Sequence, residues 1–233
     1  MHRLNWLFTL SSLSVLLVTL ERFSFTSKIL LNPYHFLRLH EFIQIIAIIL
    51  LTIIIPVFLL KEITKNFSGF KQKDFYLVLT FIVGVYFYAT GNGVHELASF
   101  LLNNNCDVKQ ISGILCQGYF FNDYYFGNIL YFVGGFMMIA SLLLFEKRRP
   151  NETFKKKDLT ISAVNAVIYS LAIFAYAAFD RVLVGLVYST LTTIFCLWLF
   201  IPRRNQYLKF PVITYTTVTY VLGTSAAILL RLA

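Results

Sequence analysis

Residues 75–102 read FYLVLTFIVGVYFYATGNGVHELASFLL, and this stretch decides how the chain folds. A helix needs about 20 mostly apolar residues to cross the hydrocarbon core of a membrane, and the stretch is longer than that. His95 and Glu96 lie near its end. Ionisable side chains at membrane depth are rare because they are expensive to bury, so the pair indicates a functional site. The stretch therefore predicts a membrane-spanning helix that carries a site.

The composition of the whole chain agrees with a membrane protein. Hydrophobic residues make up 58% of the sequence, charged residues make up 13%, and the mean hydropathy is +0.71. A soluble domain carries about 25% charged residues. The net charge of +9 comes from short basic clusters between apolar runs, where Lys and Arg act as topology signals. We therefore expect a lipid bilayer as the surroundings and no nucleic-acid partner.

Seven stretches are apolar and long enough to span a membrane: about 4–20, 42–60, 75–102, 124–145, 159–179, 182–202 and 210–230. The expected fold class is all-α, a multi-pass transmembrane helical bundle of seven spans. The number lies between six and eight, because only Asp180-Arg181 separates the fifth span from the sixth. Residues 1–233 form a single integral membrane domain in this interpretation, with 4–20 retained as a span rather than cleaved as a signal.

The basic loops give the expected orientation. Loops 61–73, 147–157 and 203–209 are rich in Lys and Arg, and they alternate along the chain. An excess of Lys and Arg marks the cytoplasmic side, so the N-terminus is expected in the cytoplasm and the C-terminus outside. Loop 103–123 then lies outside, and loop 21–41 is the exception because it is basic as well. The expected location is the plasma membrane.

Two of the three cysteines fall in the predicted outer loop. Cys106 and Cys116 are separated by nine residues and are predicted to form a disulfide in an oxidising compartment. Two free thiols are the alternative. Cys196 lies within the sixth span and is interpreted as a small core residue.

The third span carries a polar stripe. At 100° per residue one face of the helix collects Tyr88, Asn92, His95, Glu96, Ser99 and Asn103. Lipid does not satisfy such groups, so the stripe is expected to face other helices or a wet cavity. Gly91 and Gly93 predict a break or narrowing of the helix just before His95.

Two other spans bring polar residues to the same side of the membrane. Asn32-Pro33 is typical of a helix start, and on the helix that follows His40, Glu41 and Gln44 share a face. The fourth span is expected to open at Asp123, with Asn128 about one turn later.

These positions lead to the most specific hypothesis. His40, His95 and Asp123 lie on three helices at one depth and could bind zinc or another divalent metal. Metal-bound water would be the nucleophile, with Glu96 as the general base. The protein would then be a metal-dependent hydrolase whose lipid substrate enters sideways from the outer leaflet.

Simpler interpretations stay open. Arg38 could pair with Glu41, and Asp123 could cap its helix. The motif is not H-E-x-x-H, because Ser99 stands where the second His would be. The polar cluster could instead be structural, or it could bind a lipid or small molecule without hydrolysis.

Two further functions also remain. An ion- or proton-coupled carrier would use Glu96 to carry the ion. A non-catalytic accessory or assembly protein would present the polar stripe to a membrane protein partner.

Seven spans with His, Asp and Ser near one interface are similar to the superfamily of membrane hydrolases that includes alkaline ceramidases and adiponectin-receptor-like proteins. That superfamily uses a Ser and a His on an early helix, an Asp, and H-x-x-x-H on the last helix. Here His95 precedes Ser99, which reverses the order, and Asp123 answers to the Asp. The last span contains no His, so no functional residue is carried over to this chain.

Overall fold

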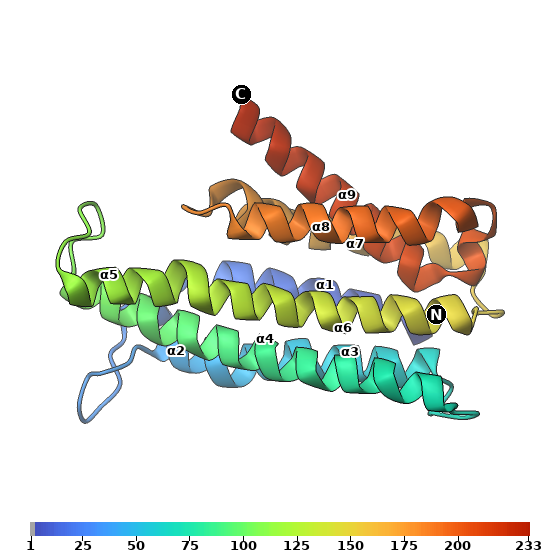
Figure 1. The fold of residues 1–233 in the computed structure, drawn as a ribbon, viewed down its shortest axis with the longest axis horizontal. Coiled ribbons are helices and arrows are strands. Elements are labelled where there is room, and N and C mark those ends of the chain that lie inside the picture. The colour runs from blue at the N-terminus through green and yellow to red at the C-terminus, as the bar shows by residue number, and fades with distance from the viewer. Residues whose placement is uncertain (1–2) are drawn as a thin grey trace.

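The computed structural model describes residues 3–233 as a bundle of long helices (Figure 1). Among these residues there is no strand, only an isolated bridge between Leu30 and Arg38. The elements are α1 (Arg3–Glu21), η1 (Phe25–Lys28), α2 (Leu39–Phe42), η2 (Ile43–Ile48), α3 (Ile49–Ile63), α4 (Gln72–Asn105), α5 (Ile114–Phe121), η3 (Asn122–Gly127), α6 (Asn128–Arg148), α7 (Lys156–Phe179), α8 (Val184–Phe200), η4 (Ile201–Lys209) and α9 (Pro211–Leu232).

Seven helices of the described chain are long and apolar enough to cross a membrane, which confirms the all-helical class and the number of candidate spans. Some of the seven combine adjoining elements: α2, η2 and α3 form one helix, α5, η3 and α6 form another, and α8 and η4 form a third. The seven are Arg3–Lys28, Leu39–Ile63, Gln72–Asn105, Ile114–Arg148, Lys156–Phe179, Val184–Lys209 and Pro211–Leu232.

Two predicted helix starts are wrong. The second span begins at Leu39 rather than at Pro33, because the Glu41 carboxylate accepts the backbone N–H of Arg38 at 3.0 Å and caps the helix there. The fourth begins at Ile114, so Asp123 lies inside a continuous helix and does not cap it. The connection between α4 and this helix is correspondingly short.

The predicted break at Gly91 and Gly93 is also wrong, because α4 is one uninterrupted helix. Gly91 serves close packing instead. A Cβ placed on it would lie 2.2 Å from the backbone nitrogen of Tyr131 on α6, and a Cβ on Gly127 would lie 2.8 Å from the backbone nitrogen of His95. Small residues let helices of a membrane bundle approach this closely. The contact brings His95 beside the segment that carries Asp123. Figure 1 shows α4 and α6 running side by side.

The two ends of the bundle differ, and we name them by their residues. The site end carries His95 and the start of α5, at the left of Figure 1. The basic end carries Asp74 and Glu146. There Glu146 of α6 accepts the backbone N–H groups of Val212 and Ile213 at 2.9 and 2.7 Å, which satisfies the start of α9.

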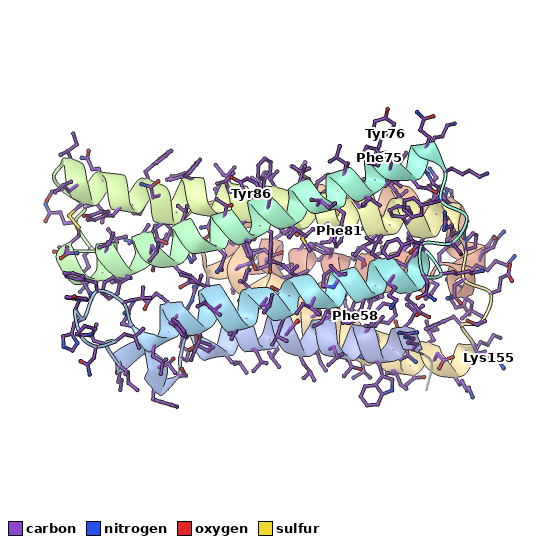
Figure 2. All side chains as sticks on the ribbon, turned by 90° about the horizontal axis from the view of Figure 1, so that it is seen from below. Phe58, Phe75, Tyr76, Phe81, Tyr86 and Lys155 are labelled. Atoms are coloured by element: carbon purple, nitrogen blue, oxygen red, sulfur yellow. A yellow bond between two sulfur atoms is a disulfide. The ribbon has the colours of Figure 1, made fainter. Side chains whose placement is uncertain are left out.

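The outward faces of the helices expose large apolar side chains, as a lipid-facing surface does. Phe75 and Tyr76 project from α4, and Phe58 and Tyr86 are also exposed, whereas Phe81 packs inside (Figure 2). A monomeric soluble protein rarely exposes apolar surface on this scale.

Candidate functional site

A cavity of about 770 Å³ lies between α1, α3, α4, α6, α7 and α9. Small-molecule sites commonly enclose 300–1,000 Å³. Its lining runs from Arg22 and Asn103 at the site end to Leu142 and Val212 toward the basic end. The cavity therefore extends along much of the bundle and changes from polar to apolar.

The polar stripe of α4 faces this cavity. All six of its members line it: Tyr88, Asn92, His95, Glu96, Ser99 and Asn103. Asn92 and Glu96 are only 7% and 5% exposed. The amide nitrogen of Asn92 has no hydrogen-bond partner among residues 3–233. An unsatisfied buried donor costs about 1–3 kcal/mol, so its presence at a cavity wall is informative.

His95 is held by Asp123 across the α4–η3 contact. Its Nδ1 lies 2.7 Å from Asp123 Oδ1 and 3.1 Å from the Asp123 backbone carbonyl oxygen. The shorter contact is a close ion-pair approach, and the carbonyl contact has hydrogen-bond geometry. On the other side of the ring, Nε2 lies 3.5 Å from the Arg22 guanidinium. Asp123 is buried, and both residues line the cavity.

His40 belongs to a second pair. Its Nδ1 contacts Glu21 at the end of α1, and its Nε2 lies 3.6 Å from Glu96 Oε2. Glu21 also accepts a hydrogen bond from Gln44 Nε2 at 3.1 Å and another from the Thr26 hydroxyl. His40 is thus placed between two carboxylates, one of which faces the cavity.

Two residues predicted for the cavity support it without lining it. Glu41 is fully buried and accepts hydrogen bonds from the Arg38 side chain, the simpler pairing expected from the sequence. Gln44 donates to the Val18 carbonyl oxygen at 3.1 Å. Glu41 therefore fixes the start of α2, and Gln44 ties η2 to the end of α1.

Two other residues predicted for the cavity, Ser99 and Asn128, do line it. Each takes part in a hydrogen bond within its own helix. Ser99 Oγ accepts from Asn103 Nδ2 at 3.3 Å. Asn128 Nδ2 donates to the Tyr124 carbonyl oxygen at 3.2 Å.

The predicted metal ligands do not assemble. Within residues 3–233 no three His, Cys, Asp or Glu side chains form a group that could hold a metal ion. His95 pairs with Asp123, whereas His40 pairs with Glu21 and Glu96. A zinc site needs at least three protein ligands on one ion, and in the described residues the predicted ligands are divided between these two groups.

Tyrosine rings line the middle of the cavity. The hydroxyls of Tyr88 and Tyr131 lie 2.9 Å apart, and those of Tyr188 and Tyr220 lie 2.6 Å apart. The Tyr176 hydroxyl is buried there without a partner among the described residues. This region offers apolar ring faces together with a few hydrogen-bonding groups, as ligand cavities do.

Two arginines and an acid, Arg22, Arg181 and Asp180, line the site end of the cavity. The Arg181 guanidinium lies over the Tyr124 ring, 5.6 Å from its centroid, and Arg22 lies beside His95. Burial raises the pKa of the Asp180 carboxyl, in the connection between α7 and α8. The site end of the cavity therefore carries charged side chains beside aromatic rings.

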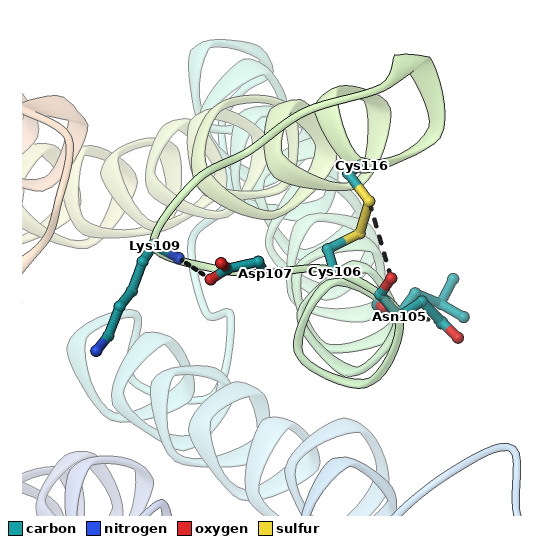
Figure 3. The surroundings of a disulfide bond; sticks show 6 residues. Asn105, Cys106, Asp107, Lys109 and Cys116 are labelled. Atoms are coloured by element: carbon teal, nitrogen blue, oxygen red, sulfur yellow. Dashed lines mark hydrogen bonds between the residues drawn. A yellow bond between two sulfur atoms is a disulfide. The ribbon is translucent and has the colours of Figure 1, made fainter.

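A disulfide joins Cys106 and Cys116 at the site end (Figure 3). It links the end of α4 to the start of α5, and the backbone N–H of Lys109 donates to Asp107 between them at 2.9 Å. Cys196 is free and buried. The bond closes the short connection between the two helices that carry His95 and Asp123.

The sequence analysis missed several residues that shape the site. Glu21 and Arg22 were considered only as charges of the first loop, although a carboxylate and a guanidinium directly after an apolar span are a signal of their own. Apart from Tyr88, tyrosines of α6, α7, α8 and α9 also line the cavity, and only the final arrangement of these helices brings them together. They include Tyr131, Tyr169, Tyr176, Tyr188 and Tyr220.

No protein-family description, curated protein or solved structure matches the chain in comparisons of its sequence and fold. The function is therefore argued from the geometry.

Proposed function

We propose that this multi-pass protein binds one amphipathic ligand, a lipid or lipid-like small molecule, in the cavity. The observation that carries the proposal is the cavity of about 770 Å³, with charged groups at one end and apolar side chains at the other. A single-chain amphiphile fits that gradient. Its polar group would lie beside Asn92, His95 and Glu96, and its chain would lie among the tyrosines and leucines.

We further propose that the site end faces outside at the plasma membrane. The opposite end carries Lys61, Lys73, Arg148 and Arg149, and Lys and Arg accumulate on the cytoplasmic side. The disulfide at the site end favours an oxidising compartment. The ligand would then enter from the outer leaflet or the outer aqueous phase.

A carrier is the second candidate, and the length of the cavity favours it. The lining reaches from Arg22 to Val212, close to the basic end, so a modest opening there would complete a path. Buried Glu96 would carry the coupled proton or cation. The accessory function draws less support, because the polar stripe of α4 faces the cavity rather than the outer surface.

Native mass spectrometry of the purified protein with added monooleoylglycerol tests ligand binding. Ala175 lines the cavity and Ala178, on the same helix, is not part of the lining. We expect one bound equivalent in the wild type and in Ala178→Phe, and at least about tenfold weaker binding in Ala175→Phe, whose ring fills cavity space. Equal binding by both variants, or none by folded wild type, contradicts the proposal.

A further inference from the structure

We propose that the cavity is a metal-independent hydrolytic site, in which His95 acts as general base and Asp123 positions it. The bond cleaved would be the carboxylic ester of a single-chain lipid. This inference rests on the proposed ligand binding and names the class of ligand and the reaction.

The contacts of His95 determine which ring nitrogen carries the proton and which nitrogen can act as the base. Two acceptor oxygens of Asp123 lie 2.7 and 3.1 Å from Nδ1, so in the neutral ring the proton belongs on Nδ1. The Arg22 guanidinium, which can only donate, lies 3.5 Å from Nε2. Nε2 is therefore the unprotonated nitrogen. A base oriented by a carboxylate on its far nitrogen is a recurrent catalytic arrangement.

Asn92 supplies the second part of the site. It lies three residues before His95, hence on the same face of α4 and about one turn deeper in the bundle. Asn92 lines the cavity and is more than nine-tenths buried, and its amide nitrogen has no partner within residues 3–233. Such a fixed donor suits the carbonyl oxygen of an ester, where negative charge develops during attack.

The reaction balances with water as the co-reactant. Nε2 of His95 removes a proton from water while the water oxygen bonds to the ester carbonyl carbon, and the carbonyl oxygen takes the negative charge beside Asn92. The bond from carbon to the alcohol oxygen then breaks, and the proton passes from His95 to the leaving alcohol. The products are a fatty acid and an alcohol, with no oxidant or reductant.

The other candidates for base and nucleophile are already engaged. Glu96 lies 3.6 Å from His40 Nε2, in a network anchored by Glu21. Ser99 Oγ accepts a hydrogen bond from Asn103 and makes no hydrogen bond to His95 among the described residues, so His95 is not in place to take its proton. Water is thus the nucleophile that this geometry favours.

The test measures release of fatty acid by purified wild type from monooleoylglycerol, lysophosphatidylglycerol and 4-methylumbelliferyl laurate, with and without EDTA and 1,10-phenanthroline. We expect release from at least one ester, unchanged by either chelator. His95→Gln should lower kcat by about 10²- to 10⁴-fold with KM unchanged, the usual contribution of a general base. Added imidazole should partly restore kcat in His95→Ala.

Asp123→Asn tests the positioning role. It should lower kcat without raising KM, and Asp123→Glu should recover part of the loss, which a purely structural role would not predict. Thermal melting of each variant establishes that it is folded.

Three results overturn the proposal: no release from any of the three esters, loss of release with a chelator, or a kcat lost in Glu96→Gln but kept in His95→Gln. If wild type binds monooleoylglycerol by native mass spectrometry yet hydrolyses nothing, the binding function stands and the hydrolytic function fails. If it neither binds nor hydrolyses, both fail.

Discussion

Buried polar groups are present at both ends of the bundle, but they differ in whether they have hydrogen-bond partners. At the basic end Asp74 pairs with Arg148 and Arg149 at 3.1 and 2.8 Å, and Glu146 accepts two backbone N–H groups of α9. At the site end Asn92 keeps an unsatisfied donor.

Burial alone therefore does not identify a functional residue. Asp74 and Glu146 are as buried as Glu96, and neither lines the large cavity. A buried charge with hydrogen-bond partners stabilises the bundle. A buried polar group without a partner at a cavity wall lowers the free energy of unfolding. Mutations at the two ends should consequently change the free energy of unfolding in opposite directions.

The largest effect is expected at the basic end. Glu146→Ala leaves the buried backbone N–H groups of Val212 and Ile213 without their acceptor. At about 1–3 kcal/mol for each of the two unsatisfied groups, the free energy of unfolding should fall by about 2–6 kcal/mol. Unfolding in mixed micelles of increasing denaturing detergent measures it. An unchanged midpoint would show that the start of α9 is solvated and that this end is not fixed by Glu146.

A smaller loss is expected where α4 meets α6. Gly91→Ala places a methyl group 2.2 Å from a backbone atom of α6, so overpacking should lower the free energy of unfolding by about 1–3 kcal/mol.

Gly93→Ala is the matched control, because a Cβ at Gly93 meets no atom within 4 Å among the described residues. Replacing this helical Gly should raise stability by up to about 1 kcal/mol. The same detergent unfolding assay compares the two variants. Equal effects would contradict the close packing that brings His95 to Asp123.

The smallest effect, of opposite sign to the loss at Glu146, is expected at Asn92. Asn92→Leu replaces an unsatisfied buried amide by an apolar side chain of similar size, which is neutral or stabilising by up to about 1 kcal/mol. Binding of monooleoylglycerol should nevertheless fall. A stability loss of several kcal/mol, measured by the same unfolding assay, would show that Asn92 is a structural partner and not a cavity group.

The sequence predicts the seven helices well because each depends on a local property, the length of an apolar run. It also predicts the polar stripe of α4, since spacings of three and four residues place side chains on one face whatever surrounds the helix. The length of an apolar run and the spacing of residues on a helix face stay the same when the helices pack together.

The partners of these residues were not predictable in the same way. The π-helical segments η2 and η3 turn the chain differently from an ideal α-helix, and the spacing of residues along the sequence gives no signal for them. Gln44 lies in η2 and Asp123 lies in η3. In the folded chain His40 contacts Glu21 and His95 contacts Asp123, which are pairs between residues far apart in the sequence. The fourth helix extends back to Ile114, and the Cys106–Cys116 disulfide ties its first turn to the end of α4.

The central claim is that the polar groups of α4 line a cavity open to the outside, and thiol labelling tests it most directly. In a Cys196→Ala background, Ser99→Cys lies in the cavity lining, and Ser141→Cys lies on buried surface outside it. A membrane-impermeant thiol reagent added outside intact cells should label Ser99→Cys, more slowly when monooleoylglycerol is present, and should leave Ser141→Cys unlabelled. Labelling of both positions alike, or of Ser99→Cys only from the cytoplasmic side, would contradict the account.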